Sequence, residues 1–261
     1  MNCVNGKHVL AKGGYGIIYL VEIHQTLAAM KVLDSVSEKE REAQSEFEQE
    51  LELLFRLRHP NILLYLGGST NNELFFLTEL METDLFELIK KKDPRADWNN
   101  NGRHFARDIA AALSYLHSKK LVHKDMKSGN ILINRSTAKL ADFGLTKTVE
   151  EKNNRLTIDR AFSAAWASPE QINPNTTVSY PTDVYSFAIV IWEILTGKQP
   201  WDNVGTFQLL TATAAGEFKK WHPTPKNTIP ELDLMLAKCW FAEPDKRPTA
   251  EMCLLVLEGF I

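Results

Sequence analysis

The hydrophobic pattern of the first third of the chain is that of short strands. Apolar and β-branched residues stand on both sides of a glycine cluster in 7–23, KHVLAKGGYGIIYLVEI, as in two strands joined by a tight turn. Three further apolar runs have the length and composition of buried strands, at 27–33, 62–69 and 73–80. We therefore expect a small β-rich lobe at the start of the chain.

One long amphipathic helix interrupts these strands at 37–58, SEKEREAQSEFEQELELLFRLR. Its apolar residues recur at i, i+4, i+7 and i+8, and its other faces are charged. The helix should end at the HPN sequence of 59–61, because a proline disfavours helical geometry in the residue before it. The residues that mark the apolar face are Phe47, Leu51, Leu54 and Phe55.

After about Met81 the pattern becomes helical. Helices are expected at 84–91 and 104–120, and the polar insert between them at 90–102, KKKDPRADWNNNG, has the composition of a solvated loop. Segment 183–197, DVYSFAIVIWEILTG, is apolar on every face and should be a central buried helix. The predicted class is α+β, with a small β-rich lobe that carries one helix and a larger, mainly helical lobe.

Composition narrows the class of protein without naming a function. Of the 261 residues, 44% are apolar and 24% are charged, which excludes a largely disordered chain. The net charge of −3 gives no basic footprint for nucleic-acid binding. No apolar run is long enough to cross a bilayer, and the first residues lack the regions of a signal peptide. The three cysteines are far apart and odd in number, so we expect a reducing, cytoplasmic location.

Two features of the expected sheet admit both a structural and a functional interpretation. The cluster of Gly13, Gly14 and Gly16 can be a hairpin turn, or a loop whose backbone N–H groups approach phosphate oxygens closely. Lys31 lies in the middle of a buried strand, where an unpaired ammonium is costly. Either this lysine reaches solvent from a strand edge, or it meets an acidic partner, for which Glu50 on the long helix is the best candidate.

Polar groups also gather around two short strands expected at 130–134 and 138–142. Asp125 and Asn130 precede or begin the first strand, and Asp142 ends the second, just before a glycine. A single carboxylate at such a place is usually a turn-former. Two carboxylates and an amide together can hold Mg²⁺ and direct a hydroxyl.

The order of these features resembles the eukaryotic-type protein kinase catalytic domain over nearly the whole chain. Five family motifs carry the resemblance: the glycine-rich loop, the β3 lysine, the catalytic loop, DFG and APE. Here they read AKGGYGII at 11–18, AAMK at 28–31, HKDMKSGN at 123–130, DFG at 142–144 and SPE at 168–170. The resemblance implies a single bilobal domain over 1–261, with a small antiparallel β-sheet lobe plus one helix at about 1–80, a hinge at about 79–83 and a larger mainly helical lobe at about 84–261.

The resemblance implies phosphoryl transfer from ATP to a protein hydroxyl. Lys31 would bind the α/β-phosphates and pair with Glu50, and Asp125 would accept or orient the substrate hydroxyl. Asn130 and Asp142 would hold Mg²⁺, with Mn²⁺ as a second usable ion. The implied partners are ATP and a protein substrate with a serine or threonine acceptor.

The nucleotide would lie between the lobes. Ile18, Ala29 and Leu132 would sandwich the adenine, Thr78 resembles the gatekeeper, and 79–81 resembles the hinge. The full set of implied ATP-binding residues is Ala11, Gly13, Gly14, Gly16, Ile18, Ala29, Lys31, Thr78, Glu79, Met81, Leu132 and Asp142.

The resemblance also assigns supporting roles. Asp183 would anchor the catalytic loop, and Glu170 would form a buried ion pair with Arg247. A stack that joins the two lobes would consist of Leu54, Tyr65, His123 and Phe143.

Three features favour serine/threonine over tyrosine specificity. Lys127 lies two residues after Asp125, where it would neutralise the γ-phosphate as charge develops. Ser163 lies where serine/threonine kinases carry a hydroxyl that contacts the catalytic loop. Trp166, together with CWFAEPDKRPT at 239–249, resembles the tyrosine-kinase-like group of serine/threonine kinases.

Three residues depart from the family pattern. Ala11 replaces the first loop glycine, and alanine disfavours positive φ, so nucleotide affinity could be reduced. Ser168 replaces the alanine of APE, a minor change unless its hydroxyl is buried without a partner. Lys124 replaces an arginine that clamps an activation-loop phosphate in many members. We therefore expect activity to depend less on phosphorylation of that loop, where Thr157 lies.

Two other functions are alternatives to an active protein kinase. A pseudokinase would act as a nucleotide-binding scaffold, but pseudokinases typically lose the counterparts of Lys31, Asp125 or Asp142, and all three are present. A small-molecule phosphotransferase of kinase-like fold would have no use for the SPE motif and the helical platform around Asp183. The sequence favours an active serine/threonine protein kinase.

Overall fold

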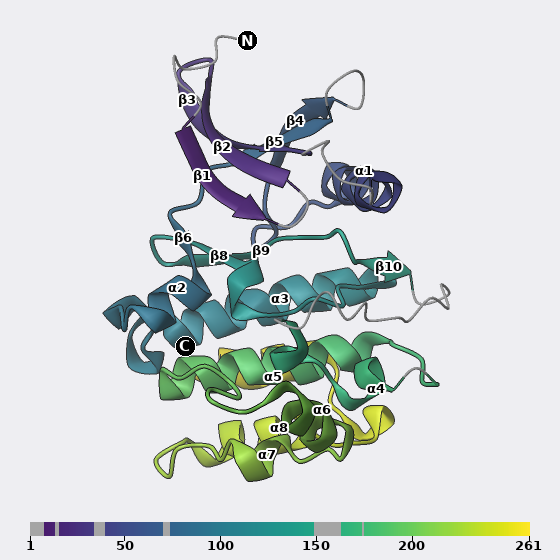
Figure 1. The fold of residues 1–261 in the computed structure, drawn as a ribbon. Coiled ribbons are helices and arrows are strands. Elements are labelled where there is room, and N and C mark those ends of the chain that lie inside the picture. Colours follow the sequence, from purple (N-terminus) through teal and green to yellow (C-terminus); the bar gives the residue numbers. More distant parts are fainter. Residues whose placement is uncertain (1–7, 14–15, 34–39, 70–73, 149–162, 174) are drawn as a thin grey trace.

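The computed structural model describes residues 8–13, 16–33, 40–69, 74–148, 163–173 and 175–261. Figure 1 shows two lobes, with the five-stranded sheet in the smaller upper lobe and most of the helices in the larger lower one. The predicted α+β class with two lobes is confirmed.

The smaller lobe is built on an antiparallel sheet with the strand order β1-β2-β3-β5-β4. Its one long helix, α1 (Glu40–Arg56), packs on the sheet, where the ring centroids of Phe47 and Phe76 are 5.1 Å apart. The helix ends before the histidine–proline pair, as predicted. The strands are β1 (His8–Gly13), β2 (Gly16–Ile23), β3 (Thr26–Val32), β4 (Tyr65–Ser69) and β5 (Phe75–Glu79).

The two faces of this sheet bury different sets of side chains, because side chains alternate along a strand. One face carries a small local core of Val21, Ala28, Met30 and Leu77. The other contributes to a large core that continues through α1 into the larger lobe. The lobes are therefore joined by continuous apolar packing as well as by the chain.

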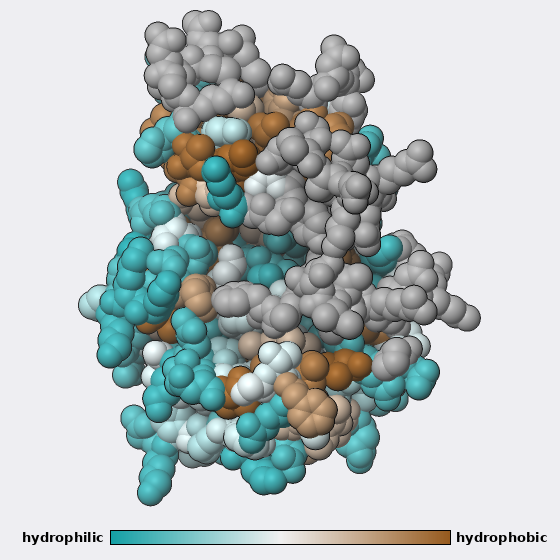
Figure 2. All heavy atoms as spheres, viewed as in Figure 1, coloured by the Kyte–Doolittle hydropathy of each residue, from teal (hydrophilic) through white to brown (hydrophobic). Residues whose placement is uncertain are grey.

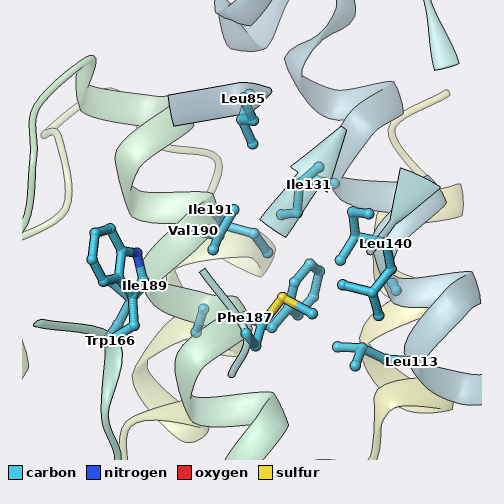
Figure 3. Close-up of a cluster of buried hydrophobic side chains, with 14 of the residues drawn as sticks. Leu85, Leu113, Ile131, Leu140, Trp166, Phe187, Ile189, Val190 and Ile191 are labelled. Atoms are coloured by element: carbon cyan, nitrogen blue, oxygen red, sulfur yellow. The ribbon is translucent and has the colours of Figure 1, made fainter. Parts of the chain in front are cut away.

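The larger lobe is organised around α5 (Tyr180–Thr196), whose residues from Thr182 to Ile194 are all buried. A proline in its first turn and Gly197 at its C-cap, with φ of 63°, define its ends. Figure 3 shows α5 side chains packed against Leu113, Ile131 and Leu140. The other helices are α2 (Leu85–Lys90), α3 (Arg103–Ser118), α4 (Pro169–Ile172), α6 (Thr206–Ala214), α7 (Phe218–Trp221), α8 (Pro230–Cys239) and α9 (Ala250–Glu258).

Short strands hold the loop at 123–130 in place between the lobes. This loop follows β7 (Leu121–Val122), which pairs with β10 (Lys147–Thr148). It leads into β8 (Ile131–Asn134), the middle strand of a sheet with β6 (Thr83–Asp84) and β9 (Thr137–Leu140). Both ends of the loop are thus fixed by backbone pairing.

The polar insert at 90–102 is not the solvated loop that its composition predicted. It forms two short helical turns, Pro94–Ala96 and Trp98–Gly102, and buries Ala96, Trp98 and Gly102. A Cβ on Gly102 would lie 2.5 Å from Ile194 Cγ2, so only glycine fits against α5 there. The composition of the insert gave a wrong prediction because its few apolar or small residues are buried, whereas polar residues such as Asp93 and Asp97 cap the turns.

The surface follows the division into lobes. On the face shown in Figure 2, hydrophilic residues cover much of the larger lobe, and apolar residues gather on the smaller one. Val9, Leu10 and Leu27 of the small sheet are exposed. Among the described helices, none combines the length and apolar character that crossing a bilayer would require.

Candidate active site

Lys31 lies on the sheet face that carries several of the predicted nucleotide-binding side chains. Direct cross-strand partners share a face. Ile18 is paired with Lys31, which is paired with Phe76, and two residues away Ala29 is paired with Thr78. Ile18, Ala29, Lys31 and Thr78 therefore converge from three strands onto one side of the sheet.

Lys31 is held by Glu50 of α1. Its Nζ donates to Glu50 Oε2 at 2.5 Å, and the glutamate side chain is only 6% exposed. Burial raises the pKa of Glu50 against the opposing charge of Lys31, and the nearby Asp142 carboxylate acts in the same direction as burial. Of the two interpretations of Lys31, the acidic partner is the one that the structure contains.

Asp125 is held by two residues of the same loop, Lys127 and Asn130. Lys127 Nζ donates to Asp125 Oδ2 at 2.7 Å and to Ser163 Oγ at 2.9 Å. Asn130 Nδ2 donates to the backbone carbonyl of Asp125 at 2.8 Å and to its Oδ2 at 2.9 Å. Burial alone would raise the pKa of Asp125, but Lys127, with His123 and Ser163, lowers it below its usual value. The carboxylate is therefore ionised at neutral pH.

The start of this loop is anchored on α5 through Asp183. Its Oδ2 accepts the backbone N–H of His123 and its Oδ1 that of Lys124, both at 2.9 Å. His117 Nε2 also lies 2.9 Å from Asp183 Oδ2. Lys124 has a φ of 69°, and its carbonyl accepts from Gln171 Nε2 at 2.8 Å. This left-handed residue is thus held by hydrogen bonds on both its N–H and its carbonyl, which offset its backbone strain.

Asn130 and Asp142 offer oxygen atoms of the kind that Mg²⁺ prefers. Because both hydrogen bonds from Asn130 Nδ2 go to Asp125, its amide oxygen is the atom that can face a cation. Asp142 is exposed and has a φ of 61°, two residues after the end of β9. Among the described residues no group of three or more acidic, histidine or cysteine side chains could hold a metal alone. The donor set fits an ion that is also bound by phosphates.

The predicted hinge begins at the end of β5. Thr78 is buried, whereas Leu132, Glu79 and Met81 are partly exposed. Glu79 Oε1 accepts from Lys139 Nζ of β9 at 2.6 Å and from the backbone N–H of Leu64 at 2.8 Å. Its side chain therefore ties the end of β5 to the larger lobe, a contact that the sequence did not predict.

The glycine cluster has a structural reason that is independent of phosphate. A Cβ on Gly16 would lie 2.3 Å from the carbonyl oxygen of Val32, so β2 can approach β3 only with glycine there. Ala11 pairs with Ile18 in β1 and has no positive φ, so alanine is not strained at this position. Gly13 ends β1, and the predicted contribution of Gly14 lies outside the described residues.

Part of the predicted stack between the lobes is observed. The rings of His123 and Phe143, both fully buried, meet edge to face with centroids 5.3 Å apart. Leu54 and Phe143 belong to one core cluster, and Tyr65 packs against it. The core thus continues from α1 to the residue that follows Asp142.

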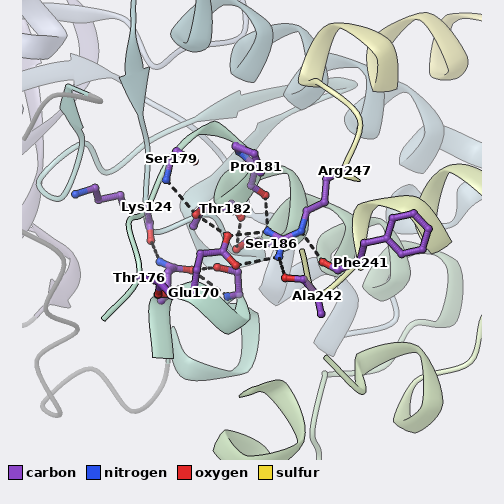
Figure 4. Close-up of polar contacts among 12 residues, drawn as sticks. Lys124, Glu170, Thr176, Ser179, Pro181, Thr182, Ser186, Phe241, Ala242 and Arg247 are labelled. Atoms are coloured by element: carbon purple, nitrogen blue, oxygen red, sulfur yellow. Dashed lines mark hydrogen bonds and ion pairs between the residues drawn. The ribbon is translucent and has the colours of Figure 1, made fainter. Parts of the chain in front are cut away.

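Glu170 and Arg247 form the predicted buried ion pair (Figure 4). Arg247 donates to the two carboxylate oxygens at 2.7 and 2.9 Å, and Thr182 Oγ1 donates to the same carboxylate at 2.8 Å. Ser168, two residues before Glu170, is fully buried, and its hydroxyl lies 3.4 Å from Gln171 Oε1, so it has a partner. The replacement of alanine by serine is accommodated.

One acidic residue near the site was not predicted from the sequence. Glu193 of α5 is completely buried and accepts from Trp166 Nε1 at 2.7 Å and from Ser128 Oγ at 2.9 Å. Burial raises its pKa from 4.5 to about 8, although both donors oppose the shift. A signal was available, because a glutamate inside a helix that is apolar on every face must be buried and needs partners.

Comparison with known proteins identifies the same family, the protein kinases, that the sequence motifs resemble. Residues 4–257 match the family described as protein tyrosine and serine/threonine kinase. The chain is 32% identical over 265 residues to serine/threonine-protein kinase CTR1 of Arabidopsis thaliana, which covers 99% of this chain and 32% of that protein. It is 32% identical over 260 residues to serine/threonine/tyrosine-protein kinase HT1 of Arabidopsis thaliana, covering 96% of this chain and 64% of that protein.

A third relative extends the similarity beyond plants. Mitogen-activated protein kinase kinase kinase 12 of Rattus norvegicus is 29% identical over 259 residues, covering 95% of this chain and 26% of that protein. The chain thus spans about a third of the length of CTR1 and about a quarter of the rat protein. Because the family match runs through nearly all of it, the chain belongs to the protein tyrosine and serine/threonine kinase family, in its tyrosine-kinase-like group.

Proposed function

We propose that the chain is a protein serine/threonine kinase that transfers the γ-phosphate of Mg-ATP to serine and threonine hydroxyls of protein substrates. The observation that carries the proposal is the linked set of Asp125, Lys127 and Ser163, in which one ammonium contacts both the carboxylate and the hydroxyl. In-line transfer needs an acceptor that orients the attacking hydroxyl and a positive charge beside the moving phosphoryl group. Asp125 and Lys127 meet these two needs within one hydrogen bond of each other.

Asp125 would orient the substrate hydroxyl. Its lowered pKa keeps it ionised, and an ionised carboxylate can only accept hydrogen bonds. The two hydrogen bonds from Asn130 fix the position of the carboxylate before substrate arrives. Lys127, already placed beside it, would neutralise charge on the γ-phosphate.

Lys31, Asn130 and Asp142 would hold the phosphates and the ion. The Lys31 ammonium, positioned by Glu50, would bind the α/β-phosphates. Asn130 and Asp142 would hold Mg²⁺, or Mn²⁺ in its place, through their oxygens. When bound, the ion would supply positive charge that bridges and neutralises the phosphates.

The nucleotide would lie between the lobes. Ile18 and Ala29 from above and Leu132 from below would sandwich the adenine, and the backbone of 79–81 would pair with its edge. Thr78, the proposed gatekeeper, is buried on the same sheet face as Ala29, which supports this pose. We divide the domain accordingly, with the smaller lobe at about 1–80, the hinge at about 79–83 and the larger lobe at about 84–261.

A cytoplasmic location forms part of the proposal. Cys239 and Cys253 are buried free thiols whose Sγ atoms lie 3.8 Å apart. Two thiols that face each other without forming a disulfide fit a reducing compartment. The proposed partners are ATP and a protein with a serine or threonine acceptor, and no nucleic acid.

Transfer of labelled γ-phosphate from Mg-ATP to the chain itself and to a generic protein substrate tests the proposal. Asp142→Asn should lose at least about 10²-fold in rate, because it removes a charged ligand of the ion. Phosphoserine or phosphothreonine should form with the parent chain and not with the variant. Absence of transfer by both, with ATP still bound, would overturn the enzyme assignment in favour of a pseudokinase, and phosphotyrosine as the main product would overturn the specificity.

A further inference from the structure

Gln49, the residue before Glu50 on α1, contacts the segment that follows Asp142. Its Nε2 donates to the backbone carbonyl of Thr146. On the neighbouring residue, the Glu50 carboxylate faces the backbone N–H of Phe143, which opposes the rise in the pKa of Glu50 that burial causes. The turn between these two points is closed by Thr146 N–H, which donates to the carbonyl of Phe143 at 3.1 Å. Gln49 therefore holds the Thr146 end of the 143–146 turn, and Glu50 lies beside its Phe143 end.

This turn continues into the structure that carries Asp125. Thr146 is fully buried, and the next residues form β10, in which Lys147 pairs with Val122 and Thr148 with Leu121 of β7. β7 leads directly into the loop at 123–130. A displacement of the turn would therefore also move Asp142, which would face the metal, and Asp125, which would orient the hydroxyl.

The chemistry of the two contacts is complementary. Gln49 donates to the Thr146 carbonyl, and the Glu50 carboxylate lies beside the Phe143 N–H of the same turn. The carbonyl of a fully buried residue needs such a donor, since leaving it unpaired is costly. Because a helix turns by a fixed angle per residue, holding Gln49 also fixes the direction in which Glu50 points.

We propose that Gln49 is a positioning residue for phosphoryl transfer, which keeps Glu50 on Lys31 by tying α1 to the turn after Asp142. The inference rests on the roles proposed above for Lys31 and Glu50. Gln49 itself would touch neither nucleotide nor substrate. It acts through the orientation of its neighbour.

The test compares Gln49→Met and Gln49→Ala with Gln44→Ala. Methionine keeps the length and helix propensity of glutamine but has no donor. Gln44 is an exposed glutamine on the same helix, whose side chain donates to Glu48 at 2.9 Å, so its replacement is the matched control. The Gln49 variants should lower kcat about tenfold while binding of adenosine, which lacks phosphates, stays within about twofold. Gln44→Ala should keep the parent kcat.

A double substitution distinguishes positioning from a general structural role. If Gln49 acts through Glu50, adding Gln49→Met to Glu50→Gln should cost less than about twofold in kcat, because Glu50 no longer pairs with Lys31 as an ion. A full tenfold further loss would overturn the inference, as would parent-like kcat in both Gln49 variants. An inactive parent chain would instead overturn the proposed function, and the inference with it. The thermal midpoints of both Gln49 variants should fall together by only a few degrees, as one unpaired carbonyl predicts, and a drop of more than about 12 °C would assign Gln49 to folding.

Discussion

Replacing Glu193 by glutamine should remove a loss of stability that the protein suffers at alkaline pH. The glutamate is completely buried, and its pKa is raised from 4.5 to about 8 because burial disfavours the charged carboxylate. Glutamine mimics the protonated acid. Its carbonyl oxygen can accept from Trp166 Nε1, and its amide can donate to Ser128 Oγ, so neither partner is left unpaired.

The magnitude follows from linkage. A group whose folded pKa is raised stabilises the fold fully below its unfolded pKa, and this stabilisation is lost as pH rises through the folded pKa. For Glu193 the window runs from 4.5 to about 8, and each pKa unit corresponds to about 1.4 kcal/mol, which gives about 5 kcal/mol in total. Between about pH 6 and about pH 9 the expected loss from this one group is about 3 kcal/mol.

Urea unfolding of the parent chain and of Glu193→Gln at a series of pH values measures this difference. The parent should lose about 3 kcal/mol more than the variant between about pH 6 and about pH 9, and its thermal midpoint should fall by roughly 2–4 °C more for each kcal/mol. Glu258→Gln, on an exposed glutamate of α9, is the control and should keep the parental slope. If Glu193→Gln keeps that slope as well, the carboxyl does not change its protonation state in this range and the burial argument is wrong.

Three further predictions concern the larger lobe and its regulation. Arg247→Ala should lower the free energy of unfolding by about 3–5 kcal/mol, because it strands the buried Glu170 carboxylate, and Arg247→Met with Glu170→Leu should recover most of that loss in urea denaturation. Burial lowers the pKa of His222 from 6.5 to about 4, so the unfolded chain binds a proton at a higher pH than the folded chain, and thermal stability falls over this range. His222→Gln should reduce this fall in the thermal midpoint, and an unchanged slope would contradict the reasoning. Thr157→Glu and Thr157→Ala, outside the described residues, should change the transfer rate little because Lys124 lacks the planar fork of arginine, and a large gain with one and loss with the other would refute this.

Local patterns predicted those parts of the fold in which a single physical requirement decides the outcome. The apolar stripe that includes Phe47 and Leu54 predicted α1, and the run of apolar residues on all faces predicted that α5 is buried. The predicted contact of Lys31 with Glu50 follows from the cost of an unpaired buried ammonium, and it is present. The polar insert failed because burial of Trp98 and the close approach at Gly102 depend on α5, some 90 residues away, which composition cannot report.

The site was predictable as a set of residues and only partly as a set of contacts. The order of the motifs indicated Asp125, Asn130 and Asp142. It did not show that the Asn130 amide would donate both of its hydrogen bonds to Asp125. Gln49 could not be predicted from the sequence, because its role depends on a contact that is distant along the chain. A partly buried glutamine on an amphipathic helix looks like any polar residue until its donor meets a carbonyl 97 positions further along.

The position of the loop at 123–130 is set from α5, a helix that is almost entirely apolar but carries Asp183 and Glu193. Asp183 in its first turn accepts the backbone N–H groups of His123 and Lys124, and Glu193, ten residues later, accepts the hydroxyl of Ser128. At 1.5 Å per residue these two positions are about 15 Å apart along a helix that is buried on every face. The loop at 123–130 is therefore held near each end by hydrogen bonds to the same helix, α5. Asp125 lies between these two anchored ends, and its hydrogen bonds with Lys127 and Asn130 fix the direction of its carboxylate.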